Sequence, residues 1–198
     1  MTEHLANTTI FASSGPENTD RTLELAVARA QQLGISTMVV ASSSGETGRM
    51  AAERKRDLDL LVVSHSTGFN APDTQEMAPK NRAAIEAAGG RVLTCQHAFG
   101  GVGRAVRRKL DTYQLEEIIA YTLRIFGQGL KVVAEMALMA ADAGYLRTDT
   151  PVMIVAGTGK GADTAAVVLP TNAQSFFDLK IVEIVCRPAP EHPAFPTA

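Results

Sequence analysis

The sequence has little of the chemistry on which many catalytic and interaction motifs depend. Its 198 residues include no tryptophan, 5% aromatic residues and only two cysteines. Neither cysteine stands in a metal-ligand spacing, and the chain shows no Ser-His-Asp order, no metal cluster and no Gly-Lys-Ser/Thr triplet of a P-loop. Spacing alone therefore predicts no metal site and leaves any catalytic residue unknown.

Strong charge of one sign is also missing. The net charge is −2, which gives no global attraction to nucleic acid or to an anionic membrane. A basic run at 104–109 has no interleaved aromatic residues of the kind that stack on nucleic-acid bases. We interpret this run as the solvated face of a short helix, with contact to an acidic ligand as the alternative. We expect no nucleic-acid partner and no membrane partner.

No apolar run is long enough to cross a bilayer. The longest, at 130–143, contains three charged residues and is shorter than the roughly 20 residues required. The first residues lack a basic region followed by an apolar segment, so we expect no signal peptide. With no disulfide framework to suggest an oxidising compartment, these features predict a cytoplasmic protein.

What the sequence does have is a regular alternation of apolar runs and amphipathic segments. The runs lack in–out alternation, which is typical of parallel strands covered on both faces. Predicted strands of the first half lie at 8–12, 37–41, 58–64 and 91–95, and the helices between them end near residues 33, 57 and 88. The sequence therefore predicts an α/β domain with a mostly parallel sheet.

The second half predicts two further helices, at 115–126 and 130–143, and strands at 151–156, 164–169 and 181–186. The helix at 130–143 is apolar nearly all round, so it should be buried in the core or at a subunit contact. We predict a homo-oligomer, with burial inside a single chain as the alternative. Residues 1–198 are expected to form one domain, with a proline-rich arm at 188–198.

The segment at 42–47 is the clearest candidate for a binding site. It follows a predicted strand, contains four hydroxyl residues and precedes a predicted helix. Free backbone N–H groups and the helix dipole favour an anion at such a position. Gly45 would let the backbone come close to a ligand. The segment, which we call the hydroxyl loop, therefore predicts a phosphate site.

Ligands of open parallel sheets bind beyond the carboxyl ends of the strands. Four loops are expected at that edge, at 13–19, 42–47, 64–69 and 96–101. His65 and His97 follow two of the strands, where each could serve as an acid–base group or as a ligand contact. A structural, hydrogen-bonded histidine is the alternative for both.

Two further features leave several interpretations open. The segment at 157–162 fits the dinucleotide pattern G-x-G-x-x-A, but a strand-like run follows it instead of a helix. A second anion-binding turn with Lys160, or a plain turn, are the alternatives. Glu135 and Asp142 would share one face of their helix, where they could be catalytic, cap a helix or form interface salt bridges.

Two of these motifs resemble the C-terminal α/β domain of pyruvate kinase. The run Ser42-Ser43-Ser44-Gly45-Glu46-Thr47 is similar to the loop that binds the phosphate of the kinase's sugar-bisphosphate activator. The segment at 157–161 is similar to the late glycine loop of that site, although it is one residue longer here. Glu46 stands where a basic or neutral residue is common, which argues against a bisphosphate activator.

The closer resemblance is to small stand-alone proteins of this type. It rests on Asn18-Thr19, the hydroxyl loop, His65 with Gly68-Phe69, and the segments at 126–129 and 139–144. It implies a three-layer α/β/α fold and flavin mononucleotide (FMN) as a ligand. Because the kinase's catalytic barrel is absent, pyruvate kinase activity is not expected. The expected ligand-binding residues are Ser13, Asn18, Thr19, Ser42, Ser43, Ser44, Gly45, Thr47, His65, Gly68, Phe69, Gly157, Thr158, Gly159 and Lys160.

Two classes of function follow from the sequence. The first is a protein that binds a phosphorylated small molecule, with FMN as the leading candidate. The second is an enzyme that uses FMN, a sugar phosphate or a nucleotide phosphate as cofactor or substrate.

Overall fold

The computed structural model describes residues 3–189 and shows a seven-stranded sheet in the order β1-β7-β6-β5-β2-β3-β4. β6 is antiparallel to both of its neighbours, and all other pairs are parallel. The predicted mostly parallel sheet is therefore confirmed. The strands are β1 (Thr9–Phe11), β2 (Thr37–Ala41), β3 (Asp59–Ser64), β4 (Arg91–Thr94), β5 (Val152–Ala156), β6 (Thr164–Leu169) and β7 (Lys180–Pro188).

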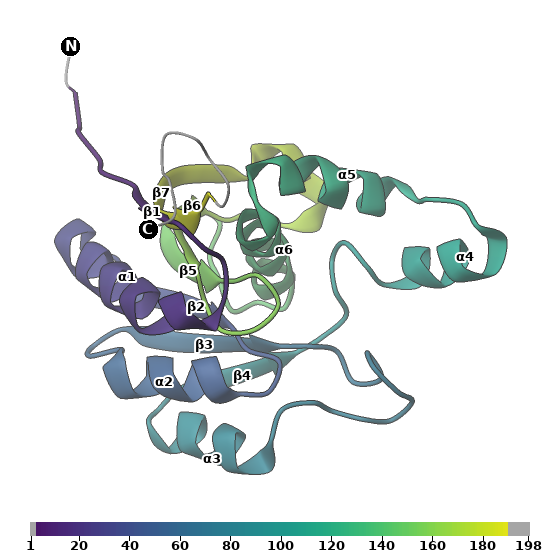
Figure 1. Cartoon of the computed structure of the whole chain (residues 1–198), viewed down its shortest axis with the longest axis horizontal. Helices are drawn as coiled ribbons and strands as arrows, with labels where there is room; N and C mark the ends of the chain where they lie inside the picture. Colours follow the sequence, from purple (N-terminus) through teal and green to yellow (C-terminus); the bar gives the residue numbers. More distant parts are fainter. Residues whose placement is uncertain (1–2, 190–198) are drawn as a thin grey trace.

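Helices cover the sheet on both faces, so the fold has three layers (Figure 1). α1, α2 and α3 lie on one face and α6 lies on the other. The α-helices are α1 (Thr19–Leu33), α2 (Glu46–Arg54), α3 (Pro79–Ala87), α4 (Val102–Leu110), α5 (Leu115–Leu123) and α6 (Gln128–Asp142), and the 3-10 helices are η1 (Pro16–Asn18), η2 (Arg124–Phe126) and η3 (Ala173–Asp178).

The central strands are apolar throughout because both of their faces are buried. In β2, Met38 and Val40 belong to the core beneath α1, α2 and α3, whereas Val39 belongs to the core beneath α6. Successive side chains of a strand point to opposite faces, so each core receives every second residue. This division explains why the sequence shows continuous apolar runs rather than alternation.

The two ends of the described chain meet at one edge of the sheet. β1 pairs in parallel with the last three residues of β7, with Thr9 opposite Cys186 and Phe11 opposite Pro188. The predicted proline-rich arm begins at Pro188, which still belongs to β7, and its residues 190–198 lie outside the described part of the chain. Among residues 3–189, no helix is sufficiently long and apolar to cross a membrane.

The apolar helix α6 is buried within a single chain. Leu130, Val133 and Met136 pack on the sheet, and Ala134 and Leu138 pack against a second cluster that includes residues of α5. The intrachain alternative therefore accounts for the apolar surface of α6 without any partner. Homo-oligomerisation remains a prediction, and α6 no longer supports it.

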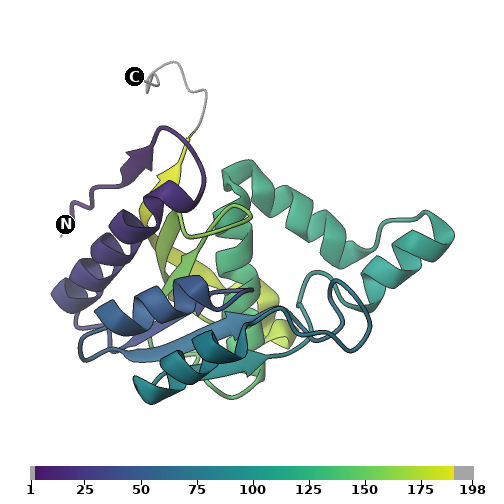
Figure 2. The same cartoon turned by 60° about the horizontal axis from the view of Figure 1, so that its bottom comes forward.

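A different surface supports association. Residues 102–126, which we call the α4–α5 arm, extend away from the sheet (Figures 1 and 2). Leu115, Ile118, Tyr121 and Ile125 lie on one stripe of this arm and are 72%, 53%, 54% and 74% exposed. α5 also packs other apolar side chains against α6, so it is apolar on two sides. A helix of this kind is normally covered by another part of a protein on both sides.

A second copy of the chain has the chemistry to cover this stripe. A two-fold contact pairs the same surface of two subunits. If two α5 helices pack antiparallel, the apolar side chains at the start of one stripe meet those at the end of the other.

We therefore predict that Ile118→Glu dissociates the assembly, because it introduces a charge into the stripe. Sedimentation velocity measures the effect: the wild type should sediment as a dimer or larger species and the variant as a monomer of 21.0 kDa. Leu33→Glu, at an exposed apolar position of α1, is the matched control and should leave the assembly intact. A monomeric wild type would contradict the prediction.

Candidate functional site

The carboxyl ends of β1 to β5 all lie at one edge of the sheet, as their pairings require. The structure thus brings the loops that follow these strands together at one edge, beside the α4–α5 arm (Figure 2). In an α/β sheet this is the edge at which ligands bind. The predicted ligand-binding residues all come from these loops or from the first turns of the helices that follow them.

The hydroxyl loop places its four hydroxyl groups in different environments. Ser42 is buried, and its Oγ accepts a hydrogen bond from the N–H of Gly48 at 3.0 Å. Thr47 is buried in the first turn of α2, Ser43 is half-buried and Ser44 is exposed. Ser42 therefore satisfies an N-terminal N–H of α2 itself, and Ser44 is the hydroxyl most open to a ligand.

The need for glycine at position 45 comes from the packing of the hydroxyl loop against α3. Its φ is 86°, and a Cβ at this position would lie 2.6 Å from Cβ of Asn81. The backbone oxygen of Ser44 accepts hydrogen bonds from the N–H of Ala78 and from Nδ2 of Asn81, at 3.1 and 3.0 Å. The start of α3, which carries Lys80, is thereby fixed against the loop.

The glycine loop at 157–163 is organised by a buried carboxylate. Asp163 is 0% exposed, and its Oδ2 accepts hydrogen bonds from the N–H groups of Gly15 and Thr158, both at 3.1 Å. Its Oδ1 accepts the hydroxyl of Thr164 at 2.8 Å. Two backbone donors that could have held a phosphate are therefore occupied by the protein's own anion.

The loop at 13–19 is tied to the glycine loop by further hydrogen bonds. The N–H of Ala162 donates to Oγ1 of Thr19 at 3.0 Å, and Nδ2 of Asn18 donates to the backbone oxygen of Ser13 at 2.9 Å. Ser13 donates its hydroxyl to Glu17 at 2.9 Å. The side chains of these three predicted ligand contacts thus make structural hydrogen bonds, and only Ser13 is exposed.

The glycine loop is followed by β6, so the helix of a dinucleotide-binding motif is missing from this position. Gly157 and Thr158 are half-buried, whereas Gly159 and Lys160 are exposed at the tip. Because β5 is the neighbour of β2, this tip lies next to the hydroxyl loop. At this edge the turn therefore presents the side chain of Lys160, whereas the N–H of Thr158 is already bonded to Asp163.

An aromatic cluster lies beside the next two strands. The ring centroids of His65 and Phe69 are 4.1 Å apart, and Phe69 is stacked on His97 at 4.9 Å. Nδ1 of His65 is 2.6 Å from Oε2 of Glu76, and the guanidinium of Arg104 lies 4.9 Å from the Phe69 ring. Gly68 is exposed in the same loop. Both predicted histidines and Phe69 are therefore brought together.

Burial lowers the pKa of His97, and the carboxylate of Glu135 opposes this shift only in part. The N–H of Ser66 points to Nε2 of His97 at 3.4 Å, which fits an acceptor nitrogen of a neutral ring. His97 is thus held in a form that can stack on aromatic groups and accept hydrogen bonds.

The two carboxylates of α6 play separate structural roles. Glu135 is buried, pairs with Lys131 on its own helix at 2.5 Å and accepts the N–H of Phe99 at 2.9 Å. Burial lowers the pKa of Lys131 despite this pair. Asp142 is exposed and accepts hydrogen bonds from Asn172 and from the N–H of Ala173, at the start of η3. The salt bridge of Glu135 is therefore internal rather than at an interface, and Asp142 is a cap.

Sequence reasoning missed several of these groups. Lys80 and Asn81 lie more than 30 positions from the hydroxyl loop, and Glu76 lies outside the four loops predicted at the ligand edge. The only sequence signal for these groups was Lys80 followed by Asn81 at the start of a predicted helix. Among residues 3–189, no group of three or more His, Cys, Asp or Glu is arranged to hold a metal ion.

Fold and site together define an α/β domain in which one edge of the sheet carries a helix N-terminus, lysines and aromatic side chains. A family model described as "Pyruvate kinase, alpha/beta domain" matches residues 20–168. The chain belongs to this family. The matched residues include the hydroxyl loop, the aromatic cluster and the glycine loop.

We predict that Asp163→Asn lowers the free energy of unfolding by about 2 kcal/mol or more, because an amide cannot accept all three hydrogen bonds in this buried position. Urea denaturation measures the loss. Asp178→Asn, an exposed carboxylate at the end of η3, is the control. Equal stabilities of the two variants would show that Asp163 does not fix the two loops.

We also predict a pH effect from His97. Its pKa lies below the ordinary value of about 6.5 in the folded protein. Below that pH the unfolded chain binds a proton at this residue before the folded chain does, so stability falls as the pH drops. Urea denaturation between neutral and mildly acidic pH should show a weaker fall for His97→Gln than for wild type. Parallel curves for the two proteins would contradict the prediction.

Proposed function

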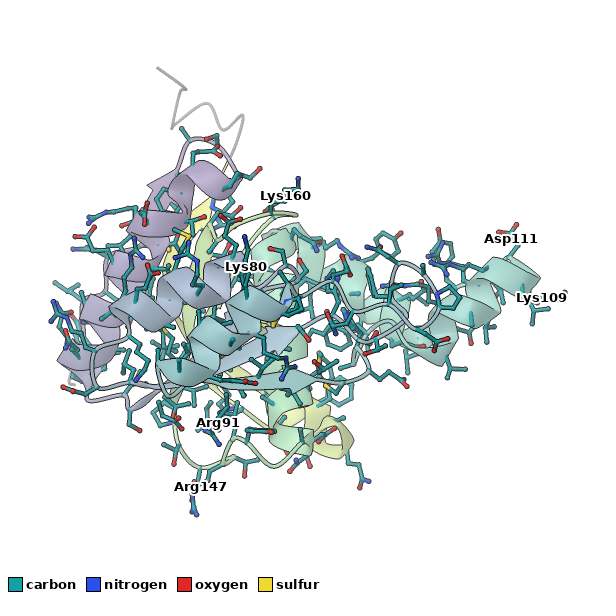
Figure 3. All side chains as sticks on the ribbon, turned by 90° about the horizontal axis from the view of Figure 1, so that it is seen from below. Lys80, Arg91, Lys109, Asp111, Arg147 and Lys160 are labelled. Carbon is teal, nitrogen blue, oxygen red and sulfur yellow. The ribbon has the colours of Figure 1, made fainter. Side chains whose placement is uncertain are left out.

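We propose that the protein binds a phosphorylated small molecule, with its phosphate at the hydroxyl loop and FMN as the leading candidate. The observation that supports this most directly is that both segments bordering the loop carry a lysine. Lys80 comes from α3, which is bonded to Ser44, and Lys160 comes from the neighbouring glycine loop. Figure 3 shows both lysines on the same side of the molecule.

The phosphate site combines three sources of attraction. The N-terminus of α2 contributes backbone N–H groups and the positive end of its dipole. Ser43 and Ser44 contribute hydroxyl donors. Lys80 and Lys160 contribute full charges, which offset the carboxylate of Glu46 in the first turn of α2.

The aromatic cluster supports FMN over a plain sugar phosphate. His65 and Phe69 follow β3, which is next to the strand that precedes the hydroxyl loop, and His97 follows β4, one strand further. Because His97 and Arg104 already cover the ring of Phe69, a flavin would stack on the free face of an imidazole, and a sugar cannot use such a flat face as well. A Cβ on Gly68 would meet no atom within 4 Å, so the loop is open at this point.

The alternative function is an enzyme that uses FMN, a sugar phosphate or a nucleotide phosphate as cofactor or substrate. The observation that favours it is the pair of His65 and Glu76. A carboxylate on Nδ1 orients an imidazole and leaves Nε2 for proton transfer. Because the family match covers the α/β domain alone, we do not propose pyruvate kinase activity.

The two thiols support a reducing compartment, and we propose the cytoplasm. Both Cys95 and Cys186 are free. Burial raises the pKa of each thiol, to about 11 for Cys186, so both remain protonated and unreactive near neutral pH.

Calorimetry of FMN binding tests the phosphate site. Ser44→Asp adds a carboxylate at the exposed hydroxyl of the loop, where it can still accept a helix N–H but repels a phosphate. We expect FMN affinity to fall by about tenfold to a hundredfold. Ser36→Asp, at the opposite end of β2, is the matched control and should bind as wild type does. The proposal fails if Ser44→Asp retains wild-type affinity for FMN.

A further inference from the structure

A large apolar pocket lies on the α6 face of the sheet, between α5 and α6. Its volume is about 610 Å³. Its walls come from the exit loop of β4, from the start of α5, from the C-terminal half of α6 and from η3. We call it the α5–α6 pocket. Its main apolar side chains are Phe99, Ile119, Leu138, Met139, Phe176 and Phe177.

The mouth of the α5–α6 pocket exposes apolar side chains to solvent. Phe177 on η3 is 93% exposed, Leu115 at the start of α5 is 72% exposed, and both line the pocket. Among the described residues that line it, only Glu116 and Asp142 are formally charged, and both are acidic. Because carboxylates repel an anionic ligand, the pocket suits an uncharged, apolar occupant.

Leu115 joins the pocket to the exposed apolar stripe of α5, because it belongs to both. The stripe ends at Ile125, and the next residue, Phe126, is also 52% exposed. In a two-fold contact with antiparallel α5 helices, the start of one stripe meets the end of the other. Ile125 and Phe126 of one copy therefore come to the mouth of the other copy's pocket, at Leu115.

The exposed area indicates a contact that extends beyond the stripe. With about 200 Å² for a large apolar residue, the four stripe residues expose roughly 500 Å² in total. A standard interface buries about 800 Å² on each partner. With Phe126 and Phe177 included, the exposed apolar area rises to roughly 800 Å². The stripe thus reaches the size of a stable interface when the pocket mouth and its occupant are part of the contact.

We propose that the α5–α6 pocket receives Ile125 and Phe126 of a second copy of the chain, and that the second copy's pocket receives the same two residues in return. This inference goes beyond the proposed function and rests on the predicted association through α5. Phe99 and Phe176 are held edge to face at 5.9 Å, so they give the ring of Phe126 a fixed aromatic wall. Aromatic anchors in desolvated pockets provide much of the binding energy of protein interfaces.

The contact between copies would share one residue with the candidate functional site. His97 lines the α5–α6 pocket and is stacked on Phe69 of the aromatic cluster. A second copy in the pocket would therefore exclude water from the side of His97 that faces the pocket.

The experiment measures the dissociation constant of the assembly by sedimentation equilibrium. Ala143→Phe fills the pocket from an exposed position at the end of α6, so it should fold normally. Phe126→Ala removes the proposed occupant. We expect each variant to raise the dissociation constant by about tenfold to a hundredfold. The matched controls are Ala87→Phe, at an exposed position of α3, and Leu33→Ala, at an exposed apolar position of α1, and both should associate as wild type does.

The double variant shows whether the two residues share one contact. With the ring at position 126 removed, the ring introduced at position 143 no longer competes with an occupant. We therefore expect the double variant to associate more tightly than the product of the two single effects predicts.

Two results would overturn the inference. If Ala143→Phe associates as wild type does, while Ile118→Glu is monomeric, the copies meet through the stripe and the pocket is not part of their contact. If the two single effects multiply in the double variant, Phe126 of the second copy does not occupy the pocket. A monomeric wild type would overturn both this inference and the predicted assembly.

Discussion

The ligand edge depends on one buried carboxylate. Asp163 joins the loop after β1 to the loop after β5 by accepting an N–H from each, although these segments are almost 150 positions apart in the sequence. A buried carboxyl group without such partners would be strongly unfavourable, so these hydrogen bonds fix the two loops relative to one another. The hydrogen bond from Ala162 to Thr19 reinforces the same junction.

The hydrogen bonds of Asp163 determine which backbone donors are left for a ligand. Asp163 occupies the backbone donors of Gly15 and Thr158, so the phosphate of our proposal is placed at the start of α2 rather than at these two donors.

The α4–α5 arm connects the proposed binding site with the surface at which we predict association. Arg104 of α4 lies over Phe69 of the aromatic cluster. α5 has the exposed apolar stripe. Contact between copies through this stripe would hold the arm in place, so ligand binding and assembly would stabilise one another by linkage.

The sequence by itself determined the α/β class with a mostly parallel sheet, the positions of most strands and helices, and the position of the hydroxyl loop, because local periodicity and turn chemistry decide these features. The three-layer arrangement was implied by the family resemblance. The sequence did not separate η2 from α5 or show η3, since short 3-10 helices have little periodicity. Tertiary structure alone decided the contacts of Gly45, Asn81, Glu135 and Asp163, whose partners are distant in the sequence or depend on burial. The tertiary structure also decided that α6 is covered within one chain and that α5 has an exposed apolar stripe. An apolar composition indicates that a helix is buried, but it does not indicate which part of the protein covers it.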